Sequence, residues 1–165
     1  MRKQSEWIGT AVLAMVLAGC ASARLYPLKG PLSTQTPPPV LKGTMSGAFF
    51  SGSFKVTLPG GELCQGHWAT VSRDNLATAS PAEAALNAEM ASIWDMVYGY
   101  QFYTGQVLGS KYHVKGVLTG TKGSTVNVEL YKPPEDVGEN LRTSVENIKG
   151  IAKDSNGNIF KIALR

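Results

Sequence analysis

Cysteine and histidine are both scarce in this chain, with two residues of each among 165. A zinc site needs three or four ligands, and the spacing Cys64-x-x-His67 supplies at most two. In a regular strand those two side chains would also point to opposite faces. The stretch Asp154-Ser155-Asn156-Gly157-Asn158 resembles a calcium loop, but the twelfth position is Arg165 instead of an acidic residue. The sequence therefore predicts neither a metal ion nor a cofactor.

Clusters of charge and catalytic motifs are missing as well. The formal net charge is only +4, and the lysines are dispersed along the chain. Proteins that bind nucleic acid carry a clustered basic patch, so we expect no nucleic-acid partner. A weak preference for anionic lipid or a cell-wall polymer is compatible with this charge. Because Gly-x-Ser-x-Gly, the phosphate loop and the dinucleotide fingerprint are also absent, we predict no catalytic residues.

Long apolar runs are missing with a single exception near the amino terminus. Arg2 and Lys3 precede an uncharged run over residues 7–23, which is marginal for a spanning helix and well sized for a secretory signal. Its end, Leu17-Ala18-Gly19-Cys20, resembles the lipobox of bacterial lipoproteins. The resemblance covers residues 1–20 and implies cleavage between Gly19 and Cys20 and acylation of Cys20. Cleavage after Ala21-Ser22-Ala23 and retention of the run as an anchor are the alternatives.

The lipoprotein resemblance also implies a location. Ala21 follows the cysteine, where an aspartate would resemble an inner-membrane retention signal. We therefore expect a lipid-anchored envelope protein, in the outer membrane facing the periplasm if the host is Gram-negative. Residues 20–42 are rich in proline and polar residues, which favours an extended spacer that need not pack. The predicted organisation is a signal peptide over 1–19, a lipidated spacer over 20–42 and one domain over 43–165.

Three stretches of the domain predict β-hairpins. Each begins with Lys-Gly, passes a turn that contains glycine and ends in three alternating apolar residues; they start at Lys42, Lys115 and Lys149. Asn156-Gly157 is typical of a type I′ turn. Glycines within strands let a sheet curve, as we expect at Gly43, Gly66, Gly116 and Gly150. The motif Gly-Glu-x-x-x-Gly-x-Trp at residues 61–68 is similar to motifs in small envelope lipoproteins of unknown function.

One helix is predicted, over about residues 81–98. Ser80-Pro81-Ala82-Glu83 forms a capping box, and Gly99 can end the helix. Apolar residues follow at spacings of three and four: Ala82, Leu86, Met90, Ile93, Trp94 and Val97. We expect this stripe to pack over the open face or mouth of the sheet. The predicted fold is mainly β, a small curved antiparallel sheet or barrel-like domain of about seven or eight strands with one amphipathic helix packed on it.

Aromatic residues crowd the end of this helix and a strand predicted over residues 100–108. Tyr98, Tyr100 and Tyr103 are candidates for a shallow binding surface, because amphipathic rings suit sugar or peptide contacts. Cys64 lacks a disulfide partner if Cys20 carries lipid. On its strand it shares the core face with Trp68, which favours an inert packed thiol over a redox or catalytic one.

These observations predict a membrane-anchored envelope lipoprotein with a non-enzymatic binding or assembly role. Its partners would be the membrane, through the acyl chains on Cys20, and an envelope protein or cell-wall polymer. Two alternatives stay open: a periplasmic inhibitor or chaperone-like lipoprotein, and a thiol-dependent enzyme that uses Cys64.

Overall fold

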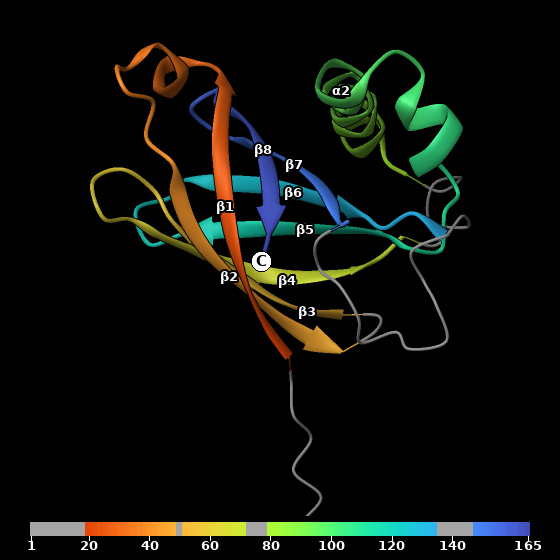
Figure 1. The fold of residues 1–165 in the computed structure, drawn as a ribbon, viewed down its shortest axis with the longest axis horizontal. Helices are drawn as coiled ribbons and strands as arrows, with labels where there is room; N and C mark the ends of the chain where they lie inside the picture. Colours follow the sequence, from red (N-terminus) through yellow and green to blue (C-terminus); the bar gives the residue numbers. More distant parts are fainter. Residues whose placement is uncertain (1–18, 49–50, 72–78, 135–146) are drawn as a thin grey trace, which may run out of the picture.

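Eight antiparallel strands close into a barrel in the computed structural model, which describes residues 19–48, 51–71, 79–134 and 147–165. Each strand pairs with its neighbours in chain order, and β1 pairs with β8 to close the barrel (Figure 1). The strands are β1 (Gly19–Lys29), β2 (Leu41–Ala48), β3 (Ser51–Thr57), β4 (Leu63–Thr70), β5 (His113–Gly120), β6 (Thr125–Tyr131), β7 (Lys149–Asp154) and β8 (Ile159–Leu164). The predicted barrel-like domain with one helix is confirmed.

Side chains fill the interior of the barrel. Alternate residues of each strand point inward, so that Val126, Val128 and Leu130 of β6 are buried there. Leu25, Phe54, Cys64 and Phe160 are fully buried, and their strands surround the same core. Eight strands leave an interior just wide enough for such packing.

Glycines within the strands allow neighbouring strands to approach closely. A Cβ atom added at Gly66 in β4 would overlap the carbonyl oxygen of Val117 in β5. At Gly116 the added atom would lie 2.8 Å from the carbonyl oxygen of His67, and at Gly43 it would lie 2.6 Å from that of Lys55. These positions therefore admit no side chain without movement of the neighbouring strand.

The predicted hairpins are present, but the turn after β7 is not type I′. Asp154 and Asn158 are joined by a backbone hydrogen bond of 3.0 Å, and only Gly157 has a positive φ, of 81°. The carboxylate of Asp154 accepts hydrogen bonds from the amides of Asn156 (2.9 Å) and Asn158 (2.8 Å). This side-chain turn holds Asn156 away from the left-handed region that a type I′ turn requires.

The spacer predicted over residues 20–42 is wrong for its first part, because residues 19–29 form β1. Ala23 and Leu25 point into the core, and β1 pairs with β2 on one side and β8 on the other. Pro27 lies at the register shift near the end of the strand, where a missing amide is tolerated. A short 3₁₀ helix, η1 (Pro31–Thr34), then buries Leu32. The apolar alternation of these few residues outweighs the prolines around them.

Helix α2 (Pro81–Tyr98) forms as predicted and lies against the outer wall of the barrel (Figure 1). The hydroxyl of Ser80 and the carboxylate of Glu83 form the capping box, and the Gly99 amide donates to the Asp95 carbonyl (3.0 Å). A closed barrel has no open face, so the apolar stripe packs on the outer side of β6 and β7 instead. Met90, Ile93 and Trp94 are buried there with Tyr131 and Ile151.

The strand predicted over residues 100–108 is wrong; a single π turn, η2 (Tyr103–Val107), occupies its place. The ring of Phe102 stacks on Trp94, with centroids 5.8 Å apart, and lies 5.1 Å from Tyr98. The amide of Tyr103 donates to the carboxylate of Asp95 (2.8 Å). Contacts with the preceding helix therefore override the β propensity of these aromatic residues.

Candidate functional site

Cys20 is exposed near the start of β1, opposite Ser46 of β2. Its side chain shares the outer face of the strand with Ser22 and Arg24, because Ala23 and Leu25 point inward. The predicted cleavage site between Gly19 and Cys20 thus lies at the first residues of the barrel. Residues 1–18 of the predicted signal peptide lie outside the described residues.

The three candidate tyrosines have different environments. Tyr100 is 87% exposed, whereas Tyr103 is buried with its ring edge-on to His113 at 6.2 Å. The Tyr98 hydroxyl donates to the carbonyl of Gly150 (3.1 Å) and accepts from its amide (3.0 Å). Burial raises the pKa of Tyr98 and of Tyr103. The structure therefore does not bring the three side chains to one surface.

Cys64 is fully buried inside the barrel. Burial raises the pKa of its thiol, and the nearby carboxylates of Glu62 and Asp154 raise it further, which disfavours the reactive thiolate. His67 and His113 belong to the outward-facing positions of β4 and β5, so neither ring shares the interior with the thiol. Within the described ranges, no group of three or more His, Cys, Asp or Glu side chains could hold a metal ion.

Beneath α2 lies a buried charge cluster that the sequence did not reveal. Glu129 of β6 is 2% exposed and lies opposite Lys115 of β5. Its Oε1 is 2.9 Å from the Lys115 Nζ, and its Oε2 is 3.0 Å from the His113 Nε2. The Trp94 indole donates to the same Oε2 at 2.7 Å. Lys115 also donates to the amide oxygen of Asn87 at 2.7 Å, so the cluster ties α2 to two strands.

These donors stabilise the charged form of Glu129. Burial by itself raises the pKa of the carboxyl, but the hydrogen bond from His113 and the charges of His113 and Lys115 outweigh it, so the pKa lies below its usual value. An ionised Glu129 requires a proton on the Nε2 of His113, whichever form the ring takes. No described side chain of the cluster is left with a buried, unsatisfied polar atom.

One sequence signal could have indicated part of this cluster. The alternation of Val126, Val128 and Leu130 predicts an outward Glu129, and the glycine turn between β5 and β6 sets Lys115 opposite it. Outward positions of an isolated sheet face water, so this pattern by itself indicates a solvated surface. Only the placement of α2 over these strands buries it.

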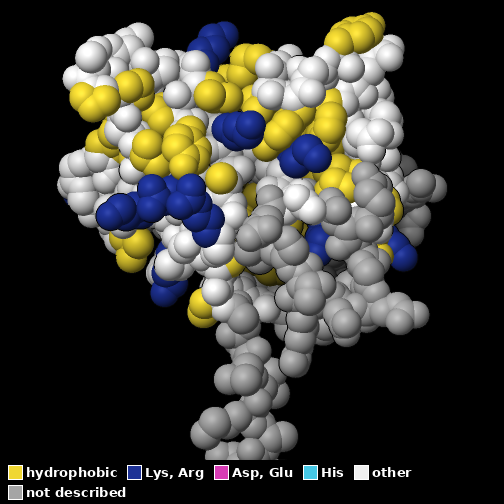
Figure 2. All heavy atoms as spheres, in the orientation of Figure 1, with side chains coloured by type: hydrophobic (Ala, Val, Ile, Leu, Met, Phe, Trp, Pro, Cys, Tyr) yellow, Lys and Arg dark blue, Asp and Glu magenta, His cyan; other side chains and the backbone are white. Residues whose placement is uncertain are grey.

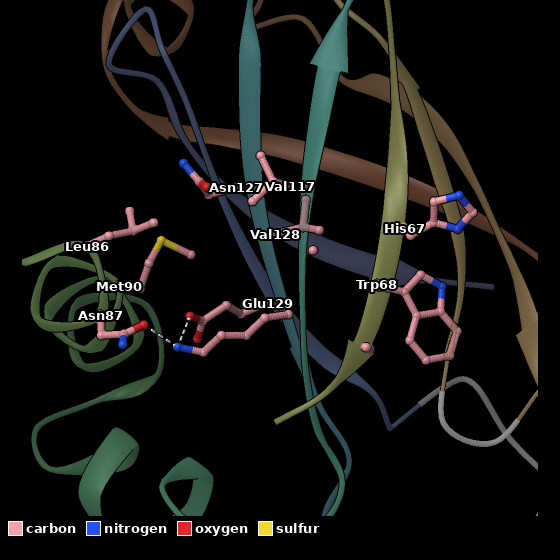
Figure 3. Close-up of a pocket in the computed structure, with 12 residues that line it drawn as sticks. His67, Trp68, Leu86, Asn87, Met90, Val117, Asn127, Val128 and Glu129 are labelled. Carbon is pink, nitrogen blue, oxygen red and sulfur yellow. Dashed lines mark hydrogen bonds and ion pairs between the residues drawn. The ribbon is translucent and has the colours of Figure 1, made fainter. Parts of the chain in front are cut away.

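A groove of about 280 Å³ opens beside the cluster (Figure 3). It lies between the amino-terminal half of α2 and the outer side of β4, β5 and β6. Leu86 and Met90 face it from the helix, and Val117, which is 54% exposed, faces it from β5. The remaining lining residues are His67, Trp68, Ala69, Asn87, Lys115, Gly116, Asn127, Val128 and Glu129.

The groove is small and mostly apolar. Its volume is close to the lower end of the roughly 300–1,000 Å³ range of small-molecule pockets. The Lys115 and Glu129 charges at one end already neutralise each other, and the Lys115 side chain is 25% exposed. The groove thus combines an apolar lining with the side-chain amides of Asn87 and Asn127.

No family model, curated protein or solved structure matches this chain. None of the described helices is long and apolar enough to cross a membrane.

Proposed function

We propose that the protein is a lipoprotein of the bacterial cell envelope, held at a membrane by acyl chains on Cys20. The observation that carries this proposal is the combination of Leu17-Ala18-Gly19-Cys20 with an exposed Cys20 at the start of the barrel. An enzyme that acylates the thiol needs it accessible. Several acyl chains on one residue anchor a protein stably, because each buried methylene contributes about 0.8 kcal/mol.

In this proposal the role of the barrel is non-enzymatic binding or assembly at the periplasmic face of the outer membrane. Ala21 supports the outer membrane, since it stands where the inner-membrane signal would have aspartate. The groove beneath α2 supports a protein partner, because its exposed apolar lining suits a partner's side chain. An inhibitor or chaperone-like role would use the same groove. A thiol-dependent enzyme has less support, because Cys64 is buried with a raised pKa.

The anchor is tested by the mass and location of the expressed chain. Wild-type protein should fractionate with membranes, begin at Cys20 and carry the mass of acyl chains on that residue. The Cys20→Ser variant should carry no acyl mass, whereas the neighbouring Ser22→Ala variant should match wild type. An unmodified Cys20 in the wild-type membrane fraction contradicts the proposal.

The groove is tested by paired substitutions of exposed apolar residues. Val117 lines the groove and Leu63 does not, and both are partly exposed on the outer wall. An envelope protein recovered with the wild-type chain should be lost with Val117→Glu and retained with Leu63→Glu. Equal recovery with both variants would place the partner elsewhere.

A further inference from the structure

Four adjacent strands of the barrel carry basic residues and no acidic one. In barrel order they are β8, β1, β2 and β3, and neither Asp nor Glu occurs within their bounds. Figure 2, which views the molecule with β1 and β8 in front, shows Lys and Arg side chains on this face and no acidic side chain. The basic face consists of Arg24, Lys42, Lys55 and Lys161, all of them exposed.

The cations of the basic face lie close together. Arg24 of β1 is directly opposite Lys42 of β2. On the other side of β1, Lys161 of β8 pairs with Tyr26 and is therefore diagonal to Arg24. Lys55 of β3 is diagonal to Lys42, because its own partner is Thr44. Diagonal neighbours in a sheet are about 7–8 Å apart, which is within the screening length of about 8 Å at physiological salt.

The exposed cations of the basic face repel one another unless an anion neutralises them. Like charges directly opposite each other in a sheet are destabilising. No ion pair involves Arg24, Lys42, Lys55 or Lys161 among the residues that the structure describes. The Nζ of Lys161 lies 5.2 Å from the centre of the Tyr98 ring and makes a cation–π contact with it. The basic face is therefore suited to an external anion.

Cys20 lies on the same outer face of β1 as Arg24 and four residues before it. Strands rise by about 3.3 Å per residue, so the two Cα atoms are about 13 Å apart along the strand. Because Cys20 is already paired with Ser46 of β2, no flexible spacer separates the proposed acyl anchor from the barrel. Acyl chains on Cys20 would hold the basic face beside the lipid headgroups.

We propose that the basic face lies on the membrane and contacts anionic lipid headgroups, so that the barrel is anchored in one orientation. The inference rests on the proposed lipidation of Cys20. Basic residues near an anionic leaflet interact favourably with it, and the effect weakens in high salt. With this wall on the membrane, the groove over β4 to β6 stays accessible to a partner. α2 lies over β6 and β7 and reaches β8 at its end, where Tyr98 contacts Lys161.

The test uses the full-length acylated protein in vesicles of phosphatidylcholine alone or with 30% phosphatidylglycerol. An amine-acetylating reagent is added briefly, and the modification rate of each lysine is read by mass spectrometry. Lys42 and Lys55 should react about fivefold more slowly on the anionic vesicles, and the difference should disappear in high salt. Lys111 and Lys122, which flank β5 outside these four strands, should react equally on both.

A charge reversal provides the matched control. Arg24→Glu should remove most of the protection of Lys42 and Lys55, whereas Lys122→Glu should leave it unchanged. Both positions are exposed, so either variant can fold. If the protein floats with both kinds of vesicle but Lys42 and Lys55 are acetylated at the same rate on both, the proposed membrane contact of the basic face is wrong. The acyl anchor is then unaffected. Protein that floats with neither contradicts the acyl anchor, and the inference fails with it.

Discussion

At the scale of single residues, Glu129 is a buried charge held by three donors, two from β5 and one from α2. Its carboxylate accepts from Lys115, His113 and Trp94 while only 2% of the residue is exposed. Burying a charged pair is costly, and removing one partner leaves the other uncompensated. We interpret the cluster as the feature that fixes where α2 lies on the barrel, and hence the shape of the groove.

We predict that Glu129→Gln lowers the free energy of unfolding by about 3 kcal/mol at neutral pH, because Lys115 is left without its carboxylate. Because the folded-state pKa of Glu129 lies below its usual 4.5, its stabilisation is complete above that pH and is lost as pH falls through the folded-state value. Urea unfolding between pH 3 and pH 7 measures both effects.

The comparison between wild type and variant isolates Glu129 from other carboxylates. Glu62 and Glu83 also have lowered pKa values, from hydrogen bonds led by Ser124 and Ser80 respectively, and both remain in the variant. The difference in unfolding free energy should therefore shrink towards low pH. A difference of the same size at pH 3 and pH 7 would contradict the role given to the Glu129 charge.

Cys64 is predicted to be protected from thiol reagents while the protein is folded. The side chain is 0% exposed inside the barrel, and its raised pKa leaves little thiolate at neutral pH. Iodoacetamide should modify Cys64 only when denaturant unfolds the barrel, as mass spectrometry of the peptide would show. In Cys20→Ser protein, where Cys64 is the remaining thiol, rapid labelling without denaturant would restore the hypothesis of a reactive cysteine.

At the scale of elements, short-range patterns predicted most of the barrel. The capping box at Ser80 and the glycine after Tyr98 gave the bounds of α2, and the Lys-Gly stretches gave the hairpins. β1, η1 and η2 were missed, because contacts with other elements decide them. β1 forms because it pairs with β2 on one side and with β8 on the other, despite Pro27. η2 forms because Phe102 and Tyr103 contact α2.

The candidate site could be predicted less well than the fold. Local spacing places Glu129 and Lys115 side by side, but it contains no information on which wall of the barrel α2 covers. The same limit applies to the tyrosines, since their exposure depends on how residues 99–108 fold back. Cys20 differs, because the lipobox is a local pattern that needs no tertiary contact.

Gly66→Ala should strongly destabilise the barrel, because the added methyl would overlap the carbonyl oxygen of Val117 on β5. We expect a loss of about 3 kcal/mol, at the upper end of the usual cost of overpacking. The neighbouring Gln65 is exposed on the outer face of β4, and Gln65→Ala should change stability by no more than about 0.5 kcal/mol. Chemical denaturation of the two variants measures this, and similar stabilities would argue against the close approach of β4 and β5.

At the scale of the whole molecule, the two ends of the barrel differ. The hairpin turns after β3, β5 and β7 gather at one end with η1, where the Leu32 amide donates to the side chain of Asn158 (2.8 Å). Glu62 accepts there from the amide of Lys122 (2.7 Å), so buried polar groups close this end. β1 begins at the opposite end, with Cys20. The proposed anchor and the polar closure are thus separated by the full length of β1.

Closure of the barrel depends on β1, so a buried charge in this strand should unfold the entire domain. Leu25 is 0% exposed among the core residues, whereas Leu28 on the same strand is 47% exposed. Leu25→Asp buries an unpaired carboxylate and should lower the free energy of unfolding by about 4 kcal/mol or more, while Leu28→Asp should cost less than about 1 kcal/mol. Thermal melting followed by circular dichroism distinguishes the two. If residues 20–42 were instead a separate spacer, the Leu25→Asp variant would have the melting temperature of wild type, because a spacer contributes nothing to the core.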